Sequence, residues 1–224
     1  MKKHPFKSTI AWNSILVVVV LLSAFVIPYF PPSWGRIPIR IGFTLIFLAA
    51  VFSLEKYRGY ILYISLAAFV LEWISGILNL QVVSYASRAI NILFFFLVVA
   101  TLIRQMATSR IVTARVILAS ISGYLLLGII FSVVVNAIMQ NDPGAFNINQ
   151  TGTSSPEGNQ HSSDSMYFGF VTLATLGYGD IVPLKAYSRS LATLISISGQ
   201  LYIATIVAML VGKFAVQRDS QKEI

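Results

Sequence analysis

Long apolar runs constrain the fold of this chain more than any other feature of its sequence. Only 11% of its 224 residues are charged and 56% are hydrophobic, whereas soluble globular domains carry about 25% charged residues. The apolar residues form six runs, most of them near the length of about 20 residues that a bilayer-spanning helix needs. We therefore expect an all-α integral membrane protein with six transmembrane helices. The runs cover residues 10–30, 37–54, 60–80, 89–103, 116–139 and 187–211.

The first of these runs could instead be a signal peptide. It is long, however, and no small-residue cleavage site follows it. Pro28 and two further prolines end the run. These features favour a helix that is retained in the protein.

The segment between the fifth and sixth runs differs from the rest of the chain. Residues 141–164 are rich in Asn, Gln, Ser, Thr, Gly and Pro, which predicts a solvated loop. Residues 166–175 are apolar, but they are too few to span a bilayer. A short apolar segment after a polar loop indicates a re-entrant helix, for which Ser163 or Asp164 is the expected N-cap.

The positions of lysine and arginine predict the orientation in the membrane. If six helices alternate in direction, most basic residues fall on one side, which is then the cytoplasmic side and holds both termini. No Lys or Arg occurs from residue 116 to residue 184, so the polar loop is external. Asp142 and Asp180 then face external water, where they would raise the local cation concentration. The net charge of +8 thus reflects a multi-pass topology in the cell membrane among lipids, and not binding to nucleic acid.

Composition also limits the chemistry that is available. The chain has no cysteine, which excludes disulfides, thiol catalysis and thiolate metal sites. His4 and His161 lie far apart in polar segments, so a histidine metal cluster within one chain is not expected. We expect no cofactor, no catalytic residue and no enzymatic activity.

Residues 175–180, with the sequence Thr-Leu-Gly-Tyr-Gly-Asp, follow directly after the short apolar segment. Backbone at membrane depth must be hydrogen-bonded unless it is buried in protein or lines water. Glycine reaches positive φ without a steric penalty, so glycines at alternate positions let successive carbonyls point the same way. A permeating cation can then be the partner of these carbonyls. Because one chain supplies one strand of such a ring, four copies around an axis would be needed.

This motif resembles the signature of potassium channels, in which backbone carbonyls replace the hydration shell of the ion. Residues 167–183 resemble the pore loop of small prokaryotic potassium channels, and residues 199–202 and 208–212 resemble their inner helix. The resemblance covers residues 116–216 and implies a homotetramer that conducts K⁺ passively. It implies that the selectivity filter consists of Thr175, Leu176, Gly177, Tyr178 and Gly179, with K⁺ coordinated by the carbonyls of the first four.

The same resemblance assigns roles outside the filter. Asp180 would lie at the outer mouth, and Gly199 matches a glycine at which inner helices can bend. Gln200, Ile203 and Val207 would line the central cavity, since their spacing places them on one face of a helix.

The chain departs from the pattern of the family at several positions. Leu176 replaces the commoner valine, and Val171 stands where some relatives have a glutamate that pairs with the aspartate after the filter. Tyr167 and Phe168 stand where many relatives have two tryptophans. We hypothesise that the Tyr167 hydroxyl reaches Asp180.

The fourth run does not have the arginine ladder of a voltage sensor. No charged residue occurs between Arg88 and Arg104, whereas sensors use about 3–4 gating charges per subunit. We therefore expect weak or absent voltage gating. Glu72, the carboxylate deep in the first four runs, is either a functional acid or a structural one that pairs with Asn13, Asn91 or a hydroxyl.

These observations predict a four-helix N-terminal domain over residues 1–105 and a pore domain over residues 106–224. The rival functions are a non-conducting or accessory pore-like subunit, a potassium transporter and a membrane enzyme. A transporter of that kind carries four pore loops in one chain, and an enzyme would need a cluster of reactive side chains within the bilayer. The parts of the pore domain are an outer helix (113–140), an external loop (141–164), a pore helix with the filter (165–183) and an inner helix (186–215).

Overall fold

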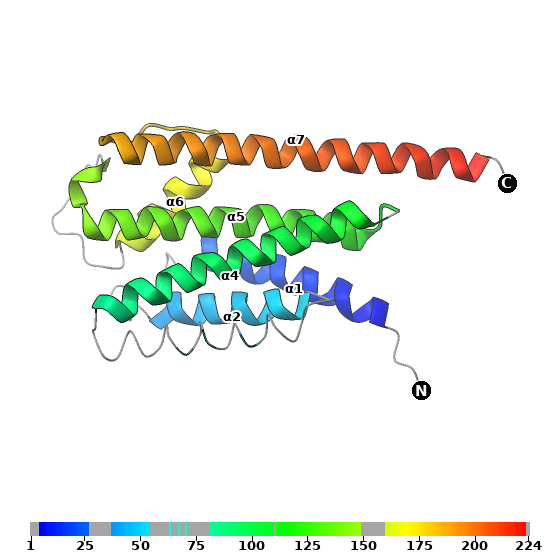
Figure 1. Ribbon diagram of the computed structural model, residues 1–224, viewed down its shortest axis with the longest axis horizontal. Helices are drawn as coiled ribbons and strands as arrows, with labels where there is room; N and C mark the ends of the chain where they lie inside the picture. Colours follow the sequence, from blue (N-terminus) through cyan, green and yellow to red (C-terminus); the bar gives the residue numbers. More distant parts are fainter. Residues whose placement is uncertain are drawn as a thin grey trace.

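Helices make up nearly all of the computed structural model, which describes residues 5–26, 37–53, 63, 67, 70, 81–109, 111–148 and 160–222 (Figure 1). In Figure 1, α1 and α5 run in one direction, and α2, α4 and α7 run in the other. The start of α1 and the end of α7 therefore lie at the same end of the molecule. The helices are α1 (Pro5–Phe25), α2 (Ile37–Ser53), α4 (Gln81–Thr108), α5 (Ala114–Asn141), α6 (Gln160–Leu173) and α7 (Ala186–Lys222).

The described residues include three helices that are long and apolar enough to span a membrane. These spans are Ala89–Thr108 in α4, Ala114–Asn141 in α5 and Ala186–Ala215 in α7. Shorter apolar stretches, Ala11–Phe25 and Arg40–Ser53, occupy α1 and α2. The predicted run over residues 60–80, with Glu72, lies almost entirely outside the described residues, so six spans remain a prediction.

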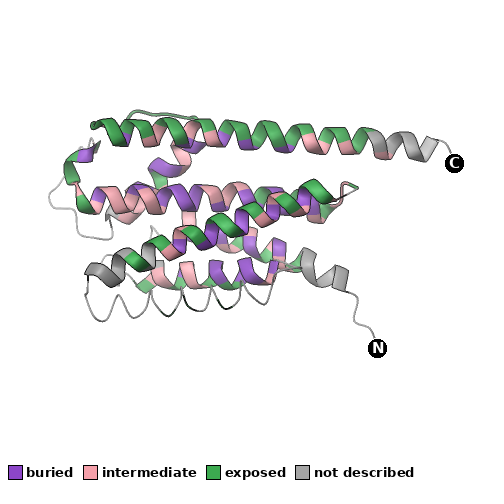
Figure 2. Ribbon diagram, in the orientation of Figure 1, coloured by how far each residue is buried: buried purple, intermediate pink, exposed green. Residues whose placement is uncertain are grey.

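Helix α5 is the centre of the fold. It contacts α1, α4, α6 and α7, and the side chains of Leu126, Ile129 and Val135 on it are fully buried. A helix with contacts on several sides must be apolar around much of its circumference, as the sequence of α5 is. Figure 2 shows the contrast between α5, which is largely buried, and α7, which is exposed along most of its length.

Aromatic side chains join α2 to α4 in the N-terminal part. The ring of Phe47 lies 4.5 Å from that of Phe94 and 4.8 Å from that of Phe95, measured between centroids. Nearby, Asn13 accepts a hydrogen bond from the Ser53 hydroxyl between α1 and α2. Asn13 was one predicted partner of Glu72; because Glu72 lies outside the described residues, that pairing stays a prediction.

The junction between α4 and α5 is held by the far end of α7. The Lys213 ammonium donates to the carbonyls of Met106 and Ala107, the latter at 3.1 Å. The Gln217 side chain accepts from the Val112 N–H at 3.2 Å. The bonds from Lys213 reach carbonyls in the last turn of α4, where a helix leaves carbonyls without intrahelical partners. The bond to Gln217 satisfies an N–H group of the link between α4 and α5.

Helix α6 is short and does not pass through the molecule. It has 14 residues, and the chain after it turns back toward the end from which α6 came, where α7 begins (Figure 1). This is the shape expected of a re-entrant segment. Helix α6 begins at Gln160, however, so the prediction that Ser163 or Asp164 is its N-cap was wrong; both residues lie within the helix.

Three other boundaries also differ from the sequence predictions. The inner helix continues to Lys222, beyond the predicted end at residue 215, because its polar last turns remain helical past the apolar span. Helix α4 continues to Thr108, past the predicted domain boundary at residue 105. The predicted loop over residues 141–164 contains regular structure: a 3₁₀ turn, η3 (Pro143–Ala145), and a strand, β1 (Phe146–Ile148).

The strand β1 pairs with a second strand, β2 (Ile181–Pro183), which follows the predicted filter. The pairing is antiparallel and joins Phe146 to Pro183 and Ile148 to Ile181. The Leu184 N–H donates to the Ala145 carbonyl at 2.9 Å. Hydrogen-bonded and non-bonded pairs alternate in an antiparallel ladder, so Pro183 occupies a position that needs no N–H donor.

Candidate functional site

The C-terminal end of α6 leads directly into residues 175–180. The Thr175 N–H donates to the Thr172 carbonyl at 3.0 Å, and the Leu176 N–H donates to the Val171 carbonyl at 2.9 Å. This pair of bonds is a Schellman motif, in which the residue after the helix cap adopts the left-handed conformation. That residue is Thr175, with φ of 58°, although glycine is the usual occupant.

Positive φ recurs at every second residue of this segment. Thr175, Gly177 and Gly179 have φ of 58°, 57° and 80°, and Leu176 and Tyr178 between them have negative φ. Alternation of positive and negative φ is the backbone pattern that lets successive carbonyls point the same way, and glycine adopts the positive φ without a steric penalty. Sequence reasoning expected this role of the glycines but not the left-handed conformation of Thr175.

The side chains of this segment have little cover within one chain. Leu176 is 58% exposed and Tyr178 is 68% exposed. A Cβ added to Gly177 or Gly179 would meet nothing within 4 Å. Within one chain, these apolar and aromatic side chains are therefore open to contact with another molecule.

Helix α7 lies against the end of α6 along one seam. The Ser196 hydroxyl donates to the Thr172 carbonyl at 3.3 Å. A Cβ on Gly199 would lie 2.1 Å from the Leu173 carbonyl oxygen, so only glycine permits this approach. Gln200, the next residue, donates from Nε2 to the Thr175 hydroxyl at 3.2 Å.

The other residues predicted for the inner helix lie beyond this seam. Ile203 and Val207 are 43% and 53% exposed in the single chain, and they follow Gln200 along α7. Gly199 lies within continuous helix, at a position of close contact. Its role as a hinge stays a prediction.

The outer end of the segment is held by the predicted contact between Tyr167 and Asp180. The Tyr167 hydroxyl donates to Asp180 Oδ2 at 2.5 Å, which confirms the hypothesis made from the sequence. The Ile181 N–H donates to Asp180 Oδ1 at 3.0 Å. The hydrogen bond from Tyr167 is the main reason why the pKa of the Asp180 carboxyl lies below its ordinary value.

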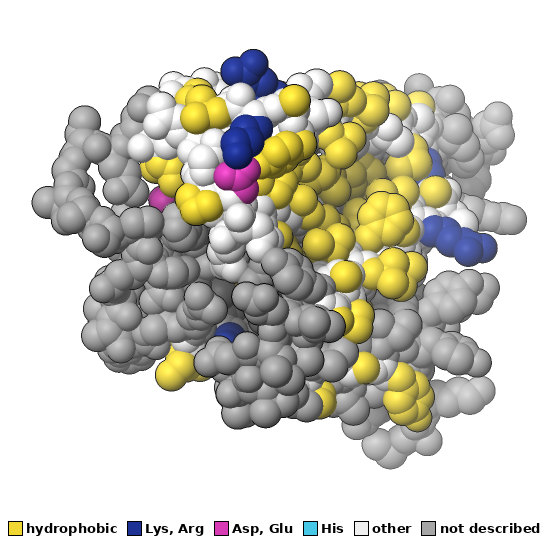
Figure 3. Space-filling view, turned by 60° about the vertical axis from the view of Figure 1, so that its left-hand side comes forward, with side chains coloured by type: hydrophobic (Ala, Val, Ile, Leu, Met, Phe, Trp, Pro, Cys, Tyr) yellow, Lys and Arg dark blue, Asp and Glu magenta, His cyan; other side chains and the backbone are white. Residues whose placement is uncertain are grey.

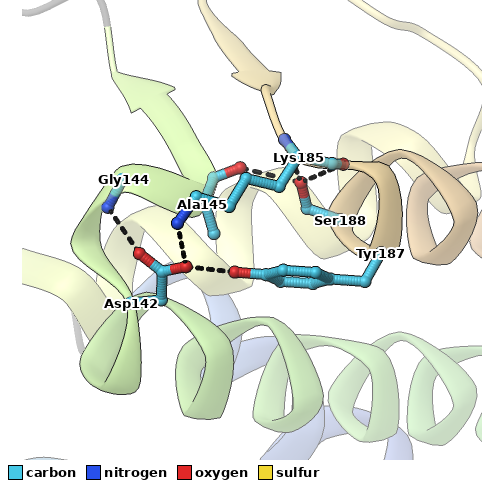
Figure 4. Close-up of polar contacts among 6 residues, drawn as sticks. All are labelled: Asp142, Gly144, Ala145, Lys185, Tyr187 and Ser188. Atoms are coloured by element: carbon cyan, nitrogen blue, oxygen red, sulfur yellow. Dashed lines mark hydrogen bonds and ion pairs between the residues drawn. The ribbon is translucent and has the colours of Figure 1, made fainter.

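A second polar cluster near the outer end was not predicted from the sequence (Figure 4). Asp142 accepts hydrogen bonds from Lys185, at 2.5 Å, and from the hydroxyl of Tyr187. Its other oxygen accepts from the Gly144 N–H at 3.2 Å. The Ser188 hydroxyl donates to the Ala145 carbonyl at 2.8 Å. We call Asp142, Gly144, Ala145, Lys185, Tyr187 and Ser188 the outer bracket.

The outer bracket joins the end of α5 to the start of α7. The hydrogen bond from Lys185, followed by the one from Tyr187, holds the pKa of Asp142 below its ordinary value, and the same ion pair raises the pKa of Lys185. Asp142 was expected to attract cations, but its charge is compensated by Lys185. The Asp-Pro-Gly sequence signals a local turn, whereas partners more than forty residues away leave no sequence signal.

Comparison with known proteins agrees with this geometry. Residues 124–216 match a family model described as an ion channel. The matched range begins in α5 and ends in α7, so it contains α6, the segment 175–180 and both strands. No curated protein matches the chain. The match and the apolar helices together support an ion channel domain in a membrane protein.

Proposed function

We propose that this protein is a potassium-selective channel subunit that conducts K⁺ passively as a homotetramer in the cell membrane. The observation that carries the proposal is the positive φ at every second residue of the segment 175–179. This backbone presents carbonyl oxygens in a row, and Thr175 adds a hydroxyl oxygen at the inner end. Four such rows around one axis would form rings of oxygen that replace the water around a potassium ion.

The orientation of α6 also supports a cation site. A helix carries the equivalent of about half a negative charge at its C-terminus. Helix α6 ends at Leu173, directly before the proposed filter. Four copies would aim four such ends toward the axis, where they favour a cation over an anion.

The exposed apolar surface supports assembly of several copies. Leu194, Leu201 and Val211 on α7 are each more than half exposed. Figure 3 shows a face on which hydrophobic side chains gather in a hollow, with few charged side chains among them. Lipid can cover part of this surface, but the polar backbone of the proposed filter cannot face lipid. A tetramer encloses that backbone and places Gln200, Ile203 and Val207 around a central cavity.

The proposed topology places both termini in the cytoplasm. In support, α1 begins and α7 ends at one end of the molecule, whereas the segment 175–180 leads to the opposite end (Figure 1). Basic residues are more frequent near the first of these ends, as cytoplasmic segments require.

The test is ion flux through purified protein in liposomes, with K⁺ or Na⁺ as the permeant ion. The wild-type chain should pass K⁺ and discriminate against Na⁺. Gly177→Ala should abolish this flux, because alanine at φ of 57° costs about 1–2 kcal/mol in each copy. Gly212→Ala is the matched control, since a Cβ there would meet nothing within 4 Å.

A folded wild-type protein that passes no ion would contradict the proposal. That result would instead favour the non-conducting, pore-like subunit. Equal flux of K⁺ and Na⁺ would contradict the proposed selectivity alone.

A further inference from the structure

Gln200 of α7 contacts the proposed filter through its side chain. Its Nε2 donates to the Thr175 hydroxyl at 3.2 Å, and Gln200 is exposed in the single chain. Packing within the chain therefore does not require an amide at this position. The polar contact that the described residues give this amide is its hydrogen bond to Thr175.

The seam between α6 and α7 fixes where this amide lies. Ser196 bonds to the Thr172 carbonyl, and the absence of a side chain at Gly199 lets α7 approach the Leu173 carbonyl. Both contacts are made by the helical turn that carries Gln200. The contacts of Ser196 and Gly199 thus set the distance between the Gln200 amide and Thr175.

The hydrogen bonds of the Thr175 hydroxyl determine how it can meet a cation. A hydroxyl has one proton and two acceptor lone pairs. Thr175 donates its proton to the Ala174 carbonyl at 2.7 Å, and Gln200 occupies one lone pair. One lone pair remains for an ion.

The two bonds have different effects because the Thr175 hydroxyl is the donor in one and the acceptor in the other. The bond to Ala174 sets the direction of the O–H group. A hydrogen bond donated to the hydroxyl oxygen draws electron density away from it, so the bond from Gln200 would lower the affinity of this oxygen for an ion.

We propose that Gln200 is a positioning residue that weakens cation binding at the innermost, Thr175 site of the filter. The inference rests on the proposed function and adds to it a residue that tunes the passage of ions between filter and cavity. Conduction requires binding that is strong enough for an ion to enter and weak enough for it to leave. A ring of four amides, one from each copy, would provide this weakening without adding charge to the cavity.

The test uses barium added from the cytoplasmic side, since Ba²⁺ is close to K⁺ in size and carries twice its charge. Gln200→Leu removes the donor and nearly conserves the volume of the side chain. Gln200→Asn keeps an amide but is one methylene shorter, so it falls short of Thr175. Both variants should be blocked at a Ba²⁺ concentration roughly three- to tenfold lower than wild type, as expected from the loss of one hydrogen bond.

Gly212→Ala is the control, because Gly212 lies in the same helix, makes no contact with Thr175, and an added Cβ there would meet nothing within 4 Å. It should leave the half-blocking Ba²⁺ concentration unchanged. A purely structural role of Gln200 would change yield and flux without shifting this concentration.

The outcomes separate the inference from the proposed function. Suppose that the wild type passes K⁺ and that barium blocks the Gln200 variants no more strongly than wild type. This result overturns the inference but does not contradict the proposed channel function. Absence of wild-type K⁺ flux overturns both. If one Gln200 variant fails to fold, the barium block of the other variant tests the inference. The rise in Tm that Ba²⁺ causes in detergent compares the ion affinity of variant and wild type without a flux measurement.

Discussion

At the scale of single residues, Thr175 is the least expected feature of the chain. A β-branched residue with positive φ is a strong outlier, and the left-handed conformation costs about 1–2 kcal/mol for a residue other than glycine. The Schellman motif at the end of α6 imposes this conformation. Glycine would fit the backbone better, but it has no hydroxyl to offer to an ion or to Gln200. Backbone strain of this kind clusters at functional sites.

The contact between Tyr167 and Asp180 gives a first prediction. Tyr167→Phe removes the donor to the carboxylate and so loosens the outer end of the segment 175–180. We expect current in a planar bilayer to decay several-fold faster than in wild type, with a lower Tm of the purified protein.

Tyr63→Phe is the control for this variant, because Tyr63 is 72% exposed and should tolerate loss of its hydroxyl. Current kinetics and Tm that match wild type in Tyr167→Phe would show that the hydrogen bond does not support the filter.

The outer bracket gives a prediction about pH. The pKa of Asp142 is lowered from 3.8 in the folded protein, so its contribution to stability is present above 3.8 and is lost as the pH falls through the folded pKa. Asp142→Asn should therefore lower Tm at neutral pH. The difference in Tm from wild type should shrink only below about pH 3.8.

A double-mutant cycle with Lys185→Gln tests whether the ion pair is responsible. The two substitutions should be less than additive in Tm, because each removes the same interaction. Full additivity, or a difference that disappears already near pH 6, would exclude this account.

At the scale of elements, α6 is a short helix held in place by glycines on its neighbours and on itself. A Cβ on Gly128 of α5 would lie 2.4 Å from the Phe170 ring, so this position needs a residue without a side chain. A Cβ on Gly169 of α6 would likewise lie too close to Ser132 of α5. Close approach of backbones through small residues is how helices associate within a membrane.

Gly169→Ala should destabilise the packing of α6 against α5. The added Cβ would lie 2.5 Å from Ser132 Oγ and 3.2 Å from its backbone nitrogen, and such overpacking costs about 1–3 kcal/mol. Unfolding in detergent should show this loss. Gly212→Ala should leave the free energy of unfolding unchanged or slightly raised, and an equal loss in both variants would contradict the packing argument.

At the scale of the whole molecule, the N-terminal helices pack on the pore helices of their own chain. Both α1 and α4 contact α5, and Lys213 and Gln217 of α7 bond to the junction between α4 and α5. In a tetramer, each N-terminal part would then lie outside its own α5. The cavity-lining side of α7 would be left free to face the axis.

This arrangement carries no voltage-sensing charge in the part of α4 between Arg88 and Arg104. Each elementary charge that crosses the membrane contributes about 2.3 kcal/mol per 100 mV. We therefore expect a nearly flat relation between conductance and voltage from about −100 to +100 mV. A steep relation that is lost on neutralising Arg88 or Arg104 would overturn this prediction.

The sequence by itself determined the class of the protein and the position of its candidate site. Apolar runs and their flanking charges identify membrane helices because a bilayer excludes charge over a known thickness. The alternating glycines pointed to the segment of the proposed filter because only glycine adopts positive φ without penalty. The bond from Tyr167 to Asp180 could be hypothesised because both lie in the stretch that resembles a known pore loop.

Only the tertiary structure decided which distant groups meet. The pairing of β1 with β2, the outer bracket and the bond between Gln200 and Thr175 join residues that are from 25 to more than forty positions apart in the chain. Such contacts depend on how closely helices approach, and this depends on Gly128, Gly169 and Gly199 together with the side chains opposite them. Local propensity and hydropathy do not predict those partners, because packing depends on two surfaces and not on one segment.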